Sequence, residues 1–64
     1  MTAEEFNATL AATGWSAAEL ARRLSLGSDR AVRRWASGQN PVPPPVALWL
    51  RQVAAAITAL PPPE

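Results

Sequence analysis

The chain has 64 residues and a net charge of +1, with 48% hydrophobic and 17% charged residues. This length suits a single domain, and the composition is too apolar and too weakly charged for a disordered chain. Histidine, cysteine, tyrosine and lysine are absent. We therefore expect no enzyme activity, no cofactor and no metal site, since the common catalytic groups and zinc ligands are missing.

No segment has the pattern of a signal peptide or of a membrane-spanning helix. Glu4 and Glu5 stand where a signal peptide has basic residues. The apolar stretch 46–60 is interrupted by Arg51 and Gln52 and is shorter than the roughly 20 residues that a membrane span requires. The expected protein is cytoplasmic, without a membrane partner and without a small-molecule ligand.

Helix-start and helix-end signals divide the chain into four predicted helices. The pairs Thr2–Glu5 and Ser16–Glu19 form capping boxes, in which a hydroxyl and a carboxylate satisfy free backbone N–H groups. Glycine in a left-handed conformation is expected to end the first three helices. The predicted helices span residues 3–12, 17–24, 29–37 and 45–60, and the capping glycines are Gly14, Gly27 and Gly38.

A Pro-rich loop separates the third predicted helix from the fourth. Ser28 is the expected cap of the third helix, with Asp29 as a competing cap. Prolines make the segment 41–45 a short, stiff loop, and the Pro-rich tail 61–64 prevents the last helix from continuing. No alternating run of β-branched residues occurs, so the expected fold class is all-α, a compact four-helix domain over residues 1–64.

Apolar residues recur at helical spacing in every predicted helix, and these stripes are expected to share one core. The predicted core positions are Ala3, Phe6, Leu10, Ala17, Leu20, Ala21, Leu24, Val32, Trp35, Ala36, Val46, Trp49, Leu50, Val53, Ile57 and Leu60. The three tryptophans are assigned to the core or to an interface rather than to base stacking, because packing is the usual role of such stripes.

The positive charge is concentrated in the middle of the chain. Residues 20–34 contain five arginines and one aspartate, whereas residues 1–19 carry three glutamates. Three of these arginines fall within about 100° of one another on the third predicted helix, opposite its apolar side. They are Arg30, Arg33 and Arg34. Such a face is typical of nucleic-acid binding, but short arginine clusters also occur on ordinary solvated surfaces.

Two motifs in this order resemble the Cro and phage-repressor type of helix-turn-helix domain. The pattern G-x-S-x-x-E-L-A-x-x-L covers residues 14–24, and V-x-R-W-x-S-G covers residues 32–38. The resemblance extends over about residues 2–38 and implies a helix-turn-helix whose second helix lies in the major groove of double-stranded DNA. The interval from Leu24 to Val32 holds one residue more than the commonest family spacing, so a longer turn is expected.

The resemblance implies contact roles for residues of both helices. In this family, residues that open the second helix of the motif, and one a turn later, contact base edges. The corresponding candidates are Asp29, Arg30, Arg33 and Arg34, of which Arg30 and Arg34 are the preferred base readers and Asp29 is more simply a cap. The candidates for contact with the DNA backbone are Ser16, Ala17, Ser28, Ser37, Gln39 and Asn40. Arg22 and Arg23 are assigned to the helix dipole or to solvent.

The resemblance also implies a two-fold homodimer on an inverted repeat, because one short helix offers too little contact for useful specificity. The candidate interface is an apolar side of the last helix, with Leu48, Trp49, Gln52, Ala55, Ala56 and Ala59. The opposing interpretation is that this helix only caps the core.

The function expected from these features is a transcriptional regulator. The simplest form is a dimeric repressor, including an autorepressor, of the kind carried by phages and other mobile elements, which blocks a promoter by occupying its operator. Two alternatives stay open. One is an antitoxin-like or adaptor module that binds a protein, with DNA binding secondary, and the other is a non-specific nucleic-acid binder.

Overall fold

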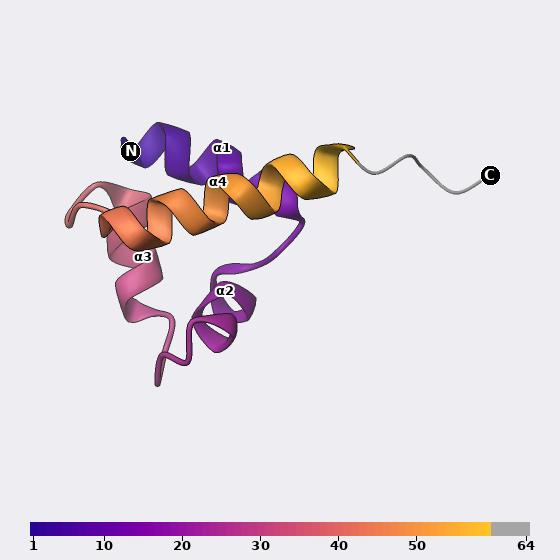
Figure 1. Cartoon of the computed structure of the whole chain (residues 1–64). Helices are drawn as coiled ribbons and strands as arrows, with labels where there is room; N and C mark the ends of the chain where they lie inside the picture. The colour runs from indigo at the N-terminus through magenta and orange to yellow at the C-terminus, as the bar shows by residue number, and fades with distance from the viewer. Residues whose placement is uncertain (60–64) are drawn as a thin grey trace.

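The computed structural model describes residues 1–59, which form four helices and no strand. The helices are α1 (Ala3–Thr13), α2 (Ala17–Arg23), α3 (Arg30–Ser37) and α4 (Pro44–Ala59). α1 packs along α4 and against α3, and α2 packs on α3 (Figure 1). The predicted all-α fold class is confirmed. Leu60 and the predicted tail 61–64 lie outside the described residues.

The observed helix bounds agree with the predicted ones to within one residue. The loop predicted over 41–45 is two residues shorter, because α4 already includes Pro44 and Pro45. Proline is favourable in a first helical turn, where its missing N–H group has no acceptor within the helix. The first intrahelical bond runs from the N–H of Ala47 to the carbonyl of Pro43, at 2.9 Å.

The cap of α1 forms as predicted. The backbone N–H of Glu5 donates to the hydroxyl of Thr2 at 3.0 Å. The Glu5 carboxylate also binds Arg51 of α4, with 3.1 Å between Oε2 and Nη2. The pKa of the Glu5 carboxyl lies below its ordinary value, mainly because of the Arg51 guanidinium and to a smaller extent because of the backbone N–H of Thr2. The start of α1 is thereby tied both to its own cap and to α4.

Only one of the two hydrogen bonds of the predicted capping box of α2 forms, the bond to the Ser16 hydroxyl. The N–H of Glu19 donates to the hydroxyl of Ser16 at 3.1 Å. The Glu19 carboxylate binds Arg22 and Arg23 instead of returning to the cap. Arginines three and four residues later lie on the same helix face and compete for the carboxylate.

The C-terminal ends of α1 and α3 follow the prediction, but the end of α2 does not. Gly14 and Gly38 adopt the left-handed conformation, with φ of +76° and +82°. After α2 this conformation falls on Ser25, with φ of +59°. The backbone of Ser25 and Leu26 then closes the helix by donating to the carbonyls of residues 22 and 21, at 3.1 and 2.9 Å. The prediction that Gly27 caps this helix was wrong, because these bonds complete the cap two residues earlier.

Replacing Ser25 by glycine is expected to stabilise the domain by about 0.5–1 kcal/mol. A left-handed conformation costs an L-residue about 1–2 kcal/mol, and the greater freedom of glycine in the unfolded chain offsets about 0.5–1 kcal/mol of this gain. Thermal unfolding should show a Tm several degrees higher. Gly14→Ala is the matched control with the opposite sign, since an added Cβ there has no neighbour within 4 Å in the described part of the chain and only the positive φ matters.

One core joins the four helices. Phe6, Leu20, Val32 and Leu50 are fully buried, one from each helix. The ring of Trp35 meets Phe6 edge-on, with 6.0 Å between centroids and 81° between planes. Such an edge-to-face pair adds to the burial of both rings. The apolar side of α3 is therefore fixed against the rest of the molecule.

The buried stripe of α4 differs from the predicted one. Ala47, Leu50 and Ala54 are buried, whereas Ile57, a predicted core residue, is 37% exposed. Positions 47, 50 and 54 follow one another by three and four residues and form the side of α4 that packs on α1. Leu50 fills the core at this contact, and the two alanines flank it. The prediction for Ile57 was wrong because the other helices do not cover this face near the end of α4.

Candidate nucleic-acid interface

α3 has one buried and one exposed side, and the buried side fixes the orientation of the helix in the domain. Val32 and Trp35 are buried on one side, with 0% and 7% of their surface exposed. Arg30 and Arg34 lie on the opposite side and are exposed. Since the buried pair prevents rotation of the helix about its own axis, the two guanidinium groups are held toward solvent.

The end of α3 is attached to α1 by a side-chain hydrogen bond. The amide of Asn7 donates to the carbonyl of Ala36 at 2.9 Å. This carbonyl belongs to the last turn of α3, where backbone acceptors have no partner within the helix. The bond gives α3 a second fixed point beside its buried side.

The four candidates for base contact divide into two kinds. Arg30 and Arg34 form no ion pair with any residue in 1–59. Arg33 binds Asp29, with 2.9 Å between Nε and Oδ2. Asp29 occupies the cap position of α3, but its carboxylate makes no capping hydrogen bond there. The expectation that this carboxylate caps the helix was therefore wrong, because the arginine four residues later binds it.

The serine expected to cap α3 stands one residue before the cap position. The Ser28 hydroxyl accepts a long hydrogen bond from the N–H of Arg30, at 3.4 Å. At the other end of α3, the Ser37 hydroxyl donates to the carbonyl of Arg34 at 3.1 Å and accepts from the N–H of Gln39 at 3.4 Å. Ser28, Ser37, Gln39 and Asn40 are all exposed. These candidates for backbone contact therefore flank the two ends of α3.

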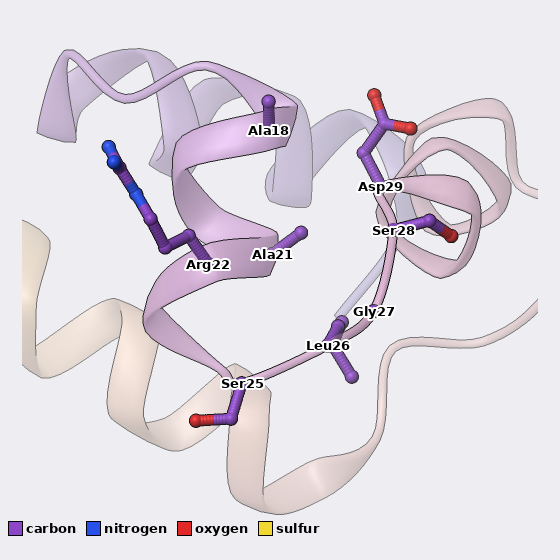
Figure 2. Close-up of a pocket in the computed structure, with 8 residues that line it drawn as sticks. All are labelled: Ala18, Ala21, Arg22, Ser25, Leu26, Gly27, Ser28 and Asp29. Atoms are coloured by element: carbon purple, nitrogen blue, oxygen red, sulfur yellow. The ribbon is translucent and has the colours of Figure 1, made fainter.

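The turn between α2 and α3 brings the starts of the two helices to one side of a shallow hollow. The hollow is lined by Ala18, Ala21, Arg22 and residues 25–29. Figure 2 shows Ala18 and Asp29 at one rim and Ser25 at the opposite end. Ser16 and Ala17, the candidates for a phosphate contact, immediately precede Ala18. The structure thus places the start of α2 on the same side of the hollow as the start of α3.

The two arginines at the end of α2 are bound within the molecule. Arg22 and Arg23 both bind Glu19. The Arg23 guanidinium also lies over the Trp15 ring, 4.2 Å from its centroid, and Trp15 stacks on Trp49 at 5.9 Å. The sequence did not predict this cluster, since it joins segments 34 positions apart. The prediction assigned these arginines to the helix dipole or to solvent and did not include their binding to Glu19 and Trp15.

The candidate dimer residues on α4 fall on one exposed, uncharged face, with one exception. Leu48 is 59% exposed. The other exposed members are Gln52, Ala55, Ala56 and Ala59. All five lie within about 100° around the helix axis. Trp49 differs, because it is partly buried against the core and stacked on Trp15.

A shallow apolar hollow between α1 and α4 borders this face. It is lined by Ala8, Thr9, Ala12, Arg51, Ala54, Ala55, Thr58 and Ala59. Ala55 and Ala59 belong both to the hollow and to the exposed face of α4. The exposed face of α4 therefore continues toward α1 through this hollow, which also contains the charged Arg51.

Within residues 1–59, no cluster of three or more His, Cys, Asp or Glu side chains is placed to hold a metal ion. None of the helices in this part of the chain combines the length and the apolar character that crossing a membrane requires. Comparison of the chain with protein families, with curated proteins and with solved structures gives no significant match.

Proposed function

We propose that the chain is a sequence-specific transcriptional regulator that binds double-stranded DNA through α3. The observation that carries the proposal is the outward side of α3, where Arg30 and Arg34 are exposed and form no ion pair with residues 1–59. An α-helix fits the major groove, and the arginine fork binds guanine O6 and N7 together or grips a phosphate. A buried opposite side, at Val32 and Trp35, limits the reorganisation that binding requires.

Contacts to the DNA backbone come from residues around α3 and from the start of α2 in this proposal. The backbone N–H groups at Ser16 and Ala17 and the polar side chains of Ser28, Gln39 and Asn40 are suitable donors to phosphate oxygens. Ser37 becomes a donor to phosphate when its hydroxyl turns away from the carbonyl of Arg34. These contacts fix the position of α3 on the duplex, whereas its arginines distinguish the bases.

The proposed regulator is a homodimer that acts as a repressor. A two-fold dimer presents two α3 helices to an inverted repeat, so that the operator symmetry matches the protein symmetry. The uncharged exposed face of α4, centred on Leu48, Gln52 and Ala55, is the proposed interface. Bound to an operator in the cytoplasm, the dimer blocks a promoter of a phage or another mobile element, including its own promoter.

Selection of bound sites from a random pool of duplex DNA tests this function. The expected result is a palindromic consensus whose half-sites are about 10 base pairs apart. Retention of DNA without any consensus would contradict sequence-specific regulation and favour a non-specific binder. Failure to retain DNA even at low salt would contradict DNA binding altogether and favour a module that binds a protein.

Replacing Leu48 by glutamate is expected to give a folded monomer. Leu48 is 59% exposed in the single chain, so its replacement leaves the core intact. By symmetry the dimer loses the burial of two leucine side chains, each contributing about 59% of the roughly 1.5–3 kcal/mol for full burial, which raises the dimer dissociation constant by a factor of about 20–400. Sedimentation equilibrium measures this change.

The matched control for this experiment is Ala11→Glu, which adds the same charge to an exposed position of α1. The control is expected to dimerise like the unchanged protein. Equal dissociation constants for the Leu48→Glu variant and the control would exclude this face of α4 from the interface.

A further inference from the structure

The ion pair between Asp29 and Arg33 occupies one edge of the proposed recognition helix. Its Nε–Oδ2 distance is 2.9 Å, with 24% of the Asp29 side chain and 73% of the Arg33 side chain exposed. Asp29 is therefore the more enclosed partner, and the arginine reaches back to it. Of the three α3 arginines, Arg33 alone has an acidic partner within residues 1–59.

The positions of the three arginines around α3 separate them further. At 100° per residue, Arg30 and Arg34 are about 40° apart and lie opposite the buried side. Arg33 is turned by about 60° from Arg30, toward Asp29. The ion pair thus stands on the flank of the helix, whereas the other two arginines share its outermost line.

Binding to DNA favours the ion pair between Asp29 and Arg33 over its separated form. An exposed ion pair of this spacing contributes little to the stability of the free protein. Beside the phosphates of a duplex, however, a carboxylate that has lost its arginine stands unpaired in a strongly negative field. Arg33 therefore gains a phosphate contact only by leaving Asp29 in an unfavourable position.

We propose that Asp29 holds Arg33 out of the DNA contacts, so that Arg30 and Arg34 alone read the bases, and that each half-site has two guanines about two base-pair steps apart. This inference rests on the proposed function, since it requires α3 to lie in the major groove. It assigns Asp29 a role as a positioning residue that determines specificity without touching DNA.

The spacing of the guanines follows from helix geometry. Residues four apart on a helix are separated by about 6 Å along its axis. Successive base pairs in B-form DNA are about 3.4 Å apart, so 6 Å corresponds to about two steps. Guanine is the base expected opposite each arginine, because its O6 and N7 accept both N–H groups of the guanidinium fork. The two guanines are expected at this separation on either strand.

Asp29→Asn tests the role of the ion pair. The asparagine keeps the shape of the side chain and is well accepted at a cap position, so the fold is expected to remain. It releases Arg33, which becomes free to bind a phosphate. The slope of log K against log salt concentration should become steeper by about 0.9 for this one additional contact. The ratio of affinities for selected and random DNA should fall, because a phosphate contact is the same for all sequences.

Glu19→Gln is the matched control, because it also raises the net charge by one and also releases bound arginines, Arg22 and Arg23. The control is expected to keep the salt slope of the unchanged protein. An equal increase in slope for both variants would overturn the proposal, since the effect would then follow from net charge alone.

The guanine pair is tested by the selected sequences themselves. With Arg33→Gln, both guanines should still be selected, whereas Arg30→Gln or Arg34→Gln should each remove the preference for one of them. A consensus without two guanines at this spacing, or loss of a guanine with Arg33→Gln, would overturn the inference while leaving sequence-specific binding in place. Failure of the unchanged protein to select any sequence is a different result, which contradicts the proposed function itself.

Discussion

Replacing Phe6 by alanine is expected to remove a large part of the free energy of unfolding of the protein. Phe6 has no exposed surface, and its ring packs edge-on against Trp35 of α3. Truncation of a buried phenylalanine costs about 3–5 kcal/mol. A chain of this length has a total stability of about 3–10 kcal/mol, so this single loss removes a large part of it. Circular dichroism during thermal and urea unfolding measures the change, and a Tm lower by more than about 10 °C is expected.

Ile57→Ala is the informative control for this variant. Ile57 has a sequence pattern that predicts burial, yet it is 37% exposed near the end of α4. Its truncation is expected to cost less than about 1 kcal/mol, since few neighbours lose contacts. A loss as large as that of Phe6→Ala would contradict the packing of α4 described above. The pair of variants therefore distinguishes the observed core from the one expected from periodicity.

The extent of the helices could be predicted because local signals control it. Hydroxyl caps at Thr2 and Ser16, left-handed glycines at positions 14 and 38, and prolines before α4 each act on neighbouring backbone groups. The end of α2 was predicted less well because Ser25, rather than a glycine, adopts the left-handed conformation. Serine carries little signal for this conformation, so sequence alone favours the nearby glycine.

The side of α4 that is buried could not be predicted as well. The helix has two adjacent apolar stripes, one of large side chains through Trp49 and Ile57 and one of smaller side chains through Ala47 and Ala54. Hydrophobicity alone favours the larger side chains. The structure buries the side with Ala47, Leu50 and Ala54, where α1 packs, and Trp49 instead stacks on Trp15 at the edge of the core. A contact between distant helices thus determines the face.

In the candidate site, too, the features that follow from local sequence signals could be predicted. The outward position of Arg30 and Arg34 follows from a helical projection, since Val32 and Trp35 define the buried side. The ion pair between Asp29 and Arg33 has a local signal, because opposite charges four residues apart on a helix attract each other. The resemblance to repressor domains instead favours base contact for both residues, and capping for Asp29, so this pairing is absent from the sequence-based prediction.

Contacts between distant segments had no local signal. The ion pair of Glu5 with Arg51 joins residues 46 positions apart. It depends on the packing of α1 alongside α4, with both helices running in the same direction (Figure 1), which periodicity does not specify. The aromatic cluster at Trp15 likewise requires the final positions of α2 and α4. These contacts join α1 and α2 to α4, and α1 and α2 are the helices on which α3 packs. None of these contacts involves the exposed side of α3.

Replacing Arg30 and Arg34 together by alanine is expected to abolish discrimination between operator and random DNA. Each arginine that forms a bidentate contact with guanine contributes about 1–3 kcal/mol of base discrimination, so the pair contributes about 2–6 kcal/mol. Because both side chains are exposed, their removal should leave the core and the Tm nearly unchanged. Competition binding with selected and scrambled duplexes measures the ratio of affinities, which should fall by a factor of at least about 30.

The double variant Arg22→Ala and Arg51→Ala separates base recognition from general charge. It removes the same two positive charges, but from residues that bind Glu19 and Glu5 within the molecule. Both variants should lose affinity for all DNA through the lower net charge, because long-range attraction to phosphates weakens. Only the Arg30 and Arg34 variant should lose discrimination. If both double variants keep the affinity ratio of the unchanged protein, α3 does not read bases and the specificity resides on another surface.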